Sequence, residues 1–153
     1  MSTVATRLAA AGITLPDPVA PIANYVPFVR SGNIVHISGQ VSLDAAGGIT
    51  GIVGVDVDMA AAVRAARMCG VNLLAQMRAA CDGNLDRVVR VVKLGGFVQA
   101  GPDFYDIPAV INGCSDVMVE AFGEAGRHAR SAVGVYRLPR NFAVEVDAVV
   151  EVA

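Results

Sequence analysis

The alternation of strand-like and helical segments constrains the fold of this chain more than any other feature. Two segments carry the roughly 3.6-residue apolar period of amphipathic helices. One is capped by Asp56 or Asp58 and runs to about Ala80, and the other spans about Ile107–Phe122. A helix between two strands requires a crossover connection, so the simplest arrangement is a mixed sheet with both helices on one face. The order of elements therefore predicts a single two-layer α+β domain over residues 1–153.

The strand predictions rest on runs of β-branched and apolar residues that are bounded by turn residues. The predicted strands are Tyr25–Arg30, Ile34–Val41, a short edge strand near Ile49–Val53, Leu85–Ala100, and two closing strands on either side of Leu138–Asn141. Side chains alternate between the two faces of a strand. Within Ile34–Val41 this alternation puts Val35, Ile37 and Gly39 on one face, with His36 and Ser38 on the other.

The N-terminal segment is predicted to be a short helix that Ser2 or Thr3 caps and Gly12 ends. A signal peptide is the alternative for this segment. The apolar run at 8–15 is short for one, and only Arg7 precedes it. We therefore expect a cytoplasmic protein.

The chain is unusually apolar and carries little net charge. Its mean hydropathy is +0.54 and 54% of its residues are hydrophobic. No stretch reaches the roughly 18–20 apolar residues that a membrane-spanning helix needs, so we expect no membrane insertion. Other copies of the chain are the simplest cover for the surplus apolar surface. The net charge of −2 and the few aromatic residues predict no nucleic-acid partner.

Motifs for metal or cofactor binding are not recognisable in the sequence. His36 and His128 each lack a second ligand at metal-binding spacing. Neither pair of adjacent glycines opens a helix with the spacing of a phosphate loop. The three cysteines, Cys69, Cys81 and Cys114, lie in apolar segments without a CxxC pattern, which predicts buried thiols in a reducing compartment.

The polar residues of the two closing strands are the best candidates for a functional site. Arg130 stands at the head of a strand, where a guanidinium can bind a carboxylate through two hydrogen bonds. Glu145 and Asp147 are two residues apart and so project from one face. On an inward face, their proximity would raise at least one pKa and create a group able to carry a proton. Alternatively, both carboxylates belong to the solvent face of an edge strand.

Several short motifs resemble signatures of the Rid family, also called YjgF-like or "endoribonuclease L-PSP"-like proteins. They are "ISGQ" at 37–40, Arg130-Ser131, Leu138-Pro139 and Glu145-x-Asp147-Ala148. The resemblance implies a chorismate-mutase-like fold and a homotrimer with three clefts between neighbouring subunits. Members with the full motif hydrolyse reactive 2-enamines and 2-imines to 2-keto acids and ammonia, without a metal or cofactor.

The resemblance also implies roles for individual residues. Arg130 would bind the carboxylate of the substrate, and Glu145 would hold or activate the attacking water. The other residues implied at the cleft are Tyr25, Ser38, Gly39 through its backbone, Asn112 from the second helix, and Ser131.

Departures from the family pattern fall around the predicted cleft. Residues 1–20 form an extension, Asn24 replaces a usual glycine, His128 stands near an expected proline, and Ala132 replaces a frequent cysteine. The alternative function is therefore a trimeric, non-catalytic binding protein or sensor for small carboxylate metabolites. Ribonuclease activity follows from the older family name only, and the acidic pI of about 5.6 argues against it.

Overall fold

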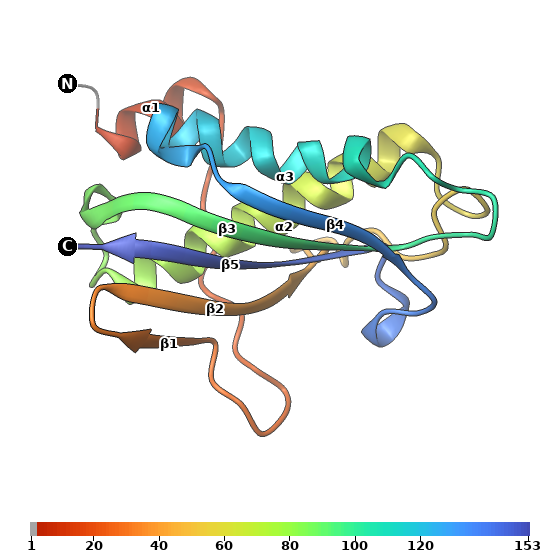
Figure 1. Cartoon of the computed structure of the whole chain (residues 1–153), viewed down its shortest axis with the longest axis horizontal. Coiled ribbons are helices and arrows are strands. Elements are labelled where there is room, and N and C mark those ends of the chain that lie inside the picture. Colours follow the sequence, from red (N-terminus) through yellow and green to blue (C-terminus); the bar gives the residue numbers. More distant parts are fainter. Residues whose placement is uncertain (1–2) are drawn as a thin grey trace.

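The computed structural model describes residues 3–153. The elements in chain order are α1 (Val4–Ala10), β1 (Phe28–Ser31), β2 (Ile34–Val41), α2 (Met59–Ala80), η1 (Leu85–Arg87), β3 (Val88–Gln99), α3 (Ile107–Phe122), η2 (Gly123–Gly126), β4 (Ala129–Val135), η3 (Pro139–Asn141) and β5 (Val144–Val152). The five strands form one sheet, and α2 and α3 lie together on one side of it (Figure 1). The prediction of a mixed sheet with two helices on one face is confirmed.

The strands are ordered β1-β2-β5-β3-β4, and only the pair β3–β4 is parallel. The closing strands β4 and β5 are therefore not hydrogen-bonded to each other, because β3 lies between them. A crossover through α3 connects β3 to β4, as a parallel pair requires. The topology brings the polar residues of both closing strands to the two sides of β3.

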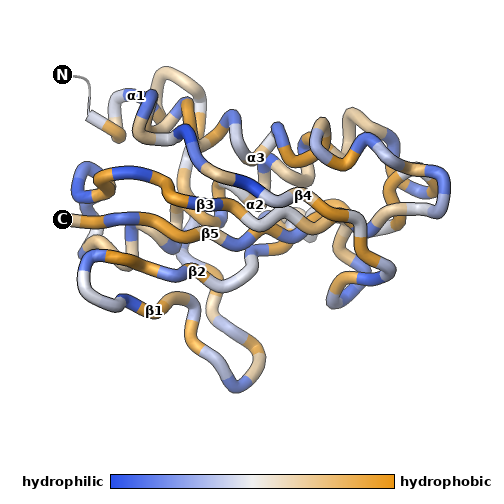
Figure 2. The backbone as a smooth tube through the Cα atoms, viewed as in Figure 1, coloured by the Kyte–Doolittle hydropathy of each residue, from blue (hydrophilic) through white to orange (hydrophobic). Residues whose placement is uncertain are grey.

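The hydrophobic core lies between the sheet and the helices α2 and α3. Residues of β5 alternate strictly between buried and partly exposed, and both hydrophobic and hydrophilic colours occur along this strand (Figure 2). The buried set, Val144, Val146, Ala148, Val150 and Val152, belongs to the core. The remaining residues, Glu145, Asp147, Val149 and Glu151, therefore occupy the opposite face, which no helix covers; we call it the open face.

The helix predictions hold closely because their end signals are local. Asp58 caps α2 by accepting a hydrogen bond from the Ala61 N–H at 2.8 Å. At the end of α3, Gly123 has the positive φ of 60° that a side chain disfavours. The N-terminal helix is also confirmed, with Thr3 as its cap; the alternative cap, Ser2, lies outside the described residues. Among residues 3–153, no helix combines the length and hydropathy needed to cross a bilayer.

Three strand predictions differ from the structure. The strand predicted over Leu85–Ala100 is Val88–Gln99, because Leu85–Arg87 form η1. The first strand begins at Phe28 rather than Tyr25, because Pro27 has no N–H to contribute to a ladder. Residues 19–27 instead form an irregular segment, here called the strap. The edge strand predicted near 49–53 is wrong, since this stretch makes only isolated bridges.

A β-bulge in β2 overturns the predicted alternation of side chains. The pairing of β2 with β5 shifts between Ile37 and Gln40, so Ser38 and Gly39 together oppose Asp147. The extra residue transfers the buried position from Gly39 to Gln40, which is 7% exposed. Gly39 therefore does not share the face of Val35 and Ile37, and the prediction that it does is wrong. As predicted, all three cysteines are buried and unpaired.

Candidate functional site

Two carboxylates lie side by side on the open face, each over a glycine of a neighbouring strand. A Cβ at Gly39 of β2 would stand 2.1 Å from Oε1 of Glu145, and a Cβ at Gly95 of β3 would stand 2.4 Å from Oδ1 of Asp147. Real Cβ atoms do not approach oxygen so closely, so both carboxylates occupy space that only glycine leaves open. The prediction that Glu145 and Asp147 share one face is confirmed.

Both carboxyl groups hold their protons more tightly than ordinary acids. Burial raises the pKa of Glu145, and the negative charge of Asp147 raises it further. Burial also raises the pKa of Asp147, although a backbone hydrogen bond from Gly95 and the charge of Lys93 act in the opposite direction. A carboxyl group with a raised pKa is suited to proton transfer near neutral pH.

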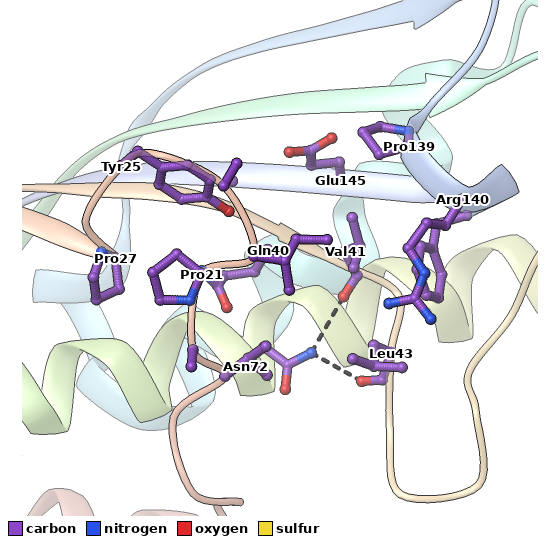
Figure 3. Close-up of a pocket in the computed structure, with 16 residues that line it drawn as sticks. Pro21, Tyr25, Pro27, Gln40, Val41, Leu43, Asn72, Pro139, Arg140 and Glu145 are labelled. Carbon is purple, nitrogen blue, oxygen red and sulfur yellow. Dashed lines mark hydrogen bonds between the residues drawn. The ribbon is translucent and has the colours of Figure 1, made fainter.

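Glu145 lies at a cavity of about 270 Å³, beside the half of β2 that β1 does not pair. We call it the Tyr25–Glu145 cavity. Its lining is Val19, Ala20, Pro21, Ile22, Ala23, Tyr25, Pro27, Gly39, Gln40, Val41, Leu43, Asn72, Pro139, Arg140, Phe142 and Glu145. The strap forms one wall, with Tyr25 and Pro21 on it, while Arg140 lies at the other end (Figure 3). Most of the lining is apolar, which favours a small ligand with an apolar portion.

Hydrogen bonds from β2 and α2 shape this cavity. The Ser38 hydroxyl donates to the Val26 carbonyl at 2.8 Å, and the Ser38 N–H donates to the Pro27 carbonyl at 2.9 Å. These two hydrogen bonds hold the strap against β2. Ser38 itself does not line the cavity. From α2, the Asn72 side chain donates to the carbonyls of Val41 and Leu43 (Figure 3).

A fully buried glutamine holds the loop at the far end of the cavity. Gln99 accepts from the Leu138 N–H at 2.7 Å and donates to the Gly51 carbonyl and the Asn141 side chain. These bonds support a turn in which Arg140 has a φ of 55° and Asn141 a φ of 64°. Such left-handed conformations are uncommon outside glycine and persist where the surroundings enforce them.

Arg130 lies in a different place, against α3. Its Nη1 donates to Oδ1 of Asn112 at 2.8 Å and to Oγ of Ser115 at 3.1 Å. Ser115 in turn contacts Nε2 of His128 at 2.9 Å, and Nδ1 of His128 lies 2.6 Å from the Gly126 carbonyl. We call Arg130, Asn112, Ser115 and His128 the Arg130 cluster.

The predicted site residues thus separate into two groups within one chain. Arg130 is opposite the buried Leu94 in the β3–β4 ladder, so its side chain is on the helical side of the sheet. Glu145 is on the open face, and no ion pair joins it to Arg130 among residues 3–153. Ser131 follows Arg130 and, opposite Gly95, lies on the open face instead. Tyr25, Gly39 and Glu145 come together at the cavity, whereas Asn112 joins Arg130.

Sequence reasoning missed Ser115, His128 and Gln99. A signal for the first two was available, because His128 is two residues before Arg130, immediately ahead of β4, and Ser115 is three residues after Asn112 on a helix. Both spacings put the residue pairs on a common face. Gln99 gave no such signal, because its partners come from loops far away in sequence.

Within residues 3–153 the structure has no group of three or more His, Cys, Asp or Glu side chains that could hold a metal ion.

The fold and the paired carboxylates of the last strand place the chain in a known class. Residues 5–151 match the family model described as "YjgF/chorismate mutase-like, putative endoribonuclease", and the chain belongs to this YjgF/chorismate mutase-like family. The match confirms the resemblance to the Rid family that the short motifs indicate.

Individual relatives support this assignment over nearly the whole chain. Protein TCP17 of Trypanosoma cruzi is 49% identical over 97% of this chain and 93% of its own length. The crystal structure of Atu1372, a protein of unknown function from Agrobacterium tumefaciens, is 48% identical, with a TM-score of 0.92 over 98% of this chain and 92% of its own. The 2-iminobutanoate/2-iminopropanoate deaminase of Dermatophagoides farinae is 30% identical over 90% of this chain and 93% of its own.

Proposed function

We propose that the protein hydrolyses reactive 2-imino acids, or their 2-enamine tautomers, to 2-keto acids and ammonia. The observation that carries the proposal is the half-buried carboxyl group of Glu145, with its raised pKa, at the mostly apolar Tyr25–Glu145 cavity. The similarity to a mite 2-iminobutanoate/2-iminopropanoate deaminase supports the choice of reaction. A small aliphatic imino acid has an apolar portion that suits such a cavity.

In the proposed reaction, a water molecule held by Glu145 attacks the imine carbon while Glu145 accepts one of its protons. The new C–O bond forms as the C=N double bond opens, and Glu145 passes the proton from water to the nitrogen, which gives a carbinolamine. Glu145 then takes the proton of the carbinolamine hydroxyl and delivers it to the nitrogen as the C–N bond breaks, so that the carbonyl forms and ammonia leaves. Because an imine is already electrophilic, orientation and one acid–base group giving about 10²–10⁴-fold are sufficient.

The carboxylate of the substrate is assigned to Arg130, which implies a second copy of the chain. Arg130 and Glu145 lie on opposite sides of one sheet, so we propose that Glu145 of one subunit and Arg130 of a neighbouring copy share a cleft in a homotrimer. Val29 and Val133 of the open face, 54% and 45% exposed, supply apolar surface for this contact. Assembly in the cytoplasm, with a small carboxylate as the only ligand, is part of the same proposal.

The proposal is tested by ammonia and keto-acid release from 2-iminopropanoate that an amino-acid oxidase generates in place. We expect the protein to accelerate release and Arg130→Ala to abolish the acceleration. Arg127→Ala is the matched control, because Arg127 is an exposed arginine whose side chain, among residues 3–153, pairs only with Glu124 at 3.1 Å. Absence of acceleration with several imino acids would contradict the proposal.

A binding protein without turnover is the second candidate. The observation in its favour is that Arg130 is held by Asn112 and Ser115 without any contribution from Glu145. This candidate predicts saturable binding of pyruvate that depends on Arg130 and is retained in Glu145→Gln. It also predicts that the protein does not accelerate imine hydrolysis.

A further inference from the structure

The Arg130 cluster fixes which hydrogens the arginine can offer to a ligand. The chain of contacts begins at the Gly126 carbonyl, which can only accept a hydrogen bond. The 2.6 Å contact therefore requires the hydrogen of the His128 ring to be on Nδ1. In the neutral ring, Nε2 is then an acceptor, so the Ser115 hydroxyl must donate to it across 2.9 Å.

The surroundings of His128 favour the neutral ring. Burial lowers the pKa of His128, the Gly126 carbonyl raises it, and the charge of Arg130 lowers it. The elements packed around the ring contribute Arg130 from β4, the Ser115 hydroxyl from α3 and the Gly126 carbonyl from η2. Lys93 lies opposite Ala129 on β3, one position away from Arg130 and hence on the other face.

A hydroxyl that donates its one hydrogen to His128 can only accept from Arg130. Nη1 of Arg130 has two hydrogens, and Ser115 and Asn112 accept one each. Nη2 makes one long contact of 3.4 Å to the Pro108 carbonyl, and Nε has no acceptor among residues 3–153. The edge of the guanidinium formed by Nε and Nη2 is therefore the part that remains available.

We propose that Ser115 and His128 are positioning residues, which orient Arg130 so that its Nε–Nη2 edge receives the planar carboxylate of a 2-imino or 2-keto acid. The inference rests on the proposed carboxylate-binding role of Arg130. Two parallel N–H donors match the two oxygens of a carboxylate. A guanidinium that is held before the ligand arrives loses less side-chain entropy on binding, which strengthens affinity.

The geometry of the cluster is tested on the unmodified protein by ¹⁵N–¹H NMR of the histidine rings. Only His36 and His128 contribute, so His36→Gln assigns the signals. We expect the Nδ1–H tautomer for His128 at neutral pH. In the Nε2–H tautomer, Nε2 could not accept the hydrogen of the Ser115 hydroxyl. Observation of that tautomer would overturn the proposal.

The effect on ligand binding is tested with pyruvate, measured by calorimetry, and with KM and kcat for 2-iminopropanoate. Ser115→Ala and His128→Leu should each weaken pyruvate binding about 5–10-fold, the equivalent of one hydrogen bond, with a larger change in KM than in kcat. His128→Gln, whose side-chain oxygen can accept from Ser115, should recover most of the affinity. The double variant Ser115→Ala/His128→Leu should bind pyruvate no more weakly than the single variant of lower affinity, because Ser115 and His128 act through one chain of contacts.

Multiplicative losses in the double variant, or no rescue by His128→Gln, would contradict the proposal. Arg127→Ala should leave pyruvate affinity unchanged. If the unmodified protein binds pyruvate but does not hydrolyse imines, the deaminase proposal fails while the affinities still test the positioning residues. If it neither binds pyruvate nor hydrolyses imines, both proposals are overturned.

Discussion

Arg130 and Glu145 extend from opposite faces of the same five-stranded sheet. Arg130 is bonded to Asn112 and Ser115 of α3, and Glu145 lies over Gly39 on the open face. A single chain therefore cannot direct both groups at one small molecule. This relationship makes self-association a requirement of the proposed chemistry, beyond its role in covering apolar surface.

The first prediction concerns the space that Gly39 leaves for the carboxylate of Glu145. In Gly39→Ala the new methyl group would displace Oε1, which stands 2.1 Å from the Cβ position. The displaced group is the end of a flexible side chain, so the protein should still fold. A misplacement of about 1 Å can reduce a rate about 10²-fold, and we expect a loss of that order in kcat/KM for 2-iminopropanoate.

The matched control is Gly95→Ala, which displaces Asp147 in the same way, with Oδ1 at 2.4 Å. Its loss of activity should be much smaller, because Asp147 is not assigned the water. Equal losses in the two variants would show that any crowding of the open face is harmful and would remove the specific role of Glu145.

The second prediction uses the charge of Asp147. Burial and this charge raise the pKa of Glu145, so Asp147→Asn should lower that pKa toward its ordinary value. Glu145 must be ionised to accept a proton from water, and a lower pKa makes the ionised form available at lower pH. The acid limb of the kcat/KM–pH profile should therefore move to lower pH, and a limb that stays in place or moves upward would exclude Glu145 as the base.

Local signals made most of the fold predictable from the sequence. The bounds of α3 and β2 agree with the predicted segments because turn and cap residues flank each of them. The bulge at Ser38 and Gly39 was not predictable, since an extra residue is defined only by the partner strand that it fails to pair with. The bulge places Gly39 beside Glu145. The irregularity that breaks the strict alternation of side chains therefore also shapes the candidate site.

The side of the sheet on which Arg130 lies depended on long-range pairing in the same way. The sequence predicted that Arg130 lies at the head of a strand. The face of the sheet on which its side chain lies follows from the pairing of Arg130 with Leu94. Its neighbours Ser115 and His128 had suggestive spacings, yet their meeting requires α3 to cross beside β4.

The third prediction concerns the buried Gln99 and the loop that carries Arg140. Gln99→Met removes the hydrogen bond that Gln99 accepts from the Leu138 N–H and the two that it donates to Gly51 and Asn141. The polar groups of these partners are then left unpaired. The free energy of unfolding should fall by about 2–4 kcal/mol, measured by urea denaturation. Gln40→Met is the control: Gln40 is also buried but makes one bond, to the Ser38 carbonyl, and should cost about 1 kcal/mol. A loss for Gln99→Met no larger than that for Gln40→Met would contradict the role assigned to Gln99.

The most direct test of a shared cleft is complementation between two inactive variants, Arg130→Ala and Glu145→Gln. If one subunit supplies Glu145 and its neighbour Arg130, an equal mixture that is unfolded and refolded together should contain both native residues in about a quarter of its clefts. We predict that imine hydrolysis returns to about that fraction of the unmodified activity. Arg130→Ala refolded with the double variant Arg130→Ala/Glu145→Gln should remain inactive. A mixture of the two single variants no more active than either variant alone would contradict the account.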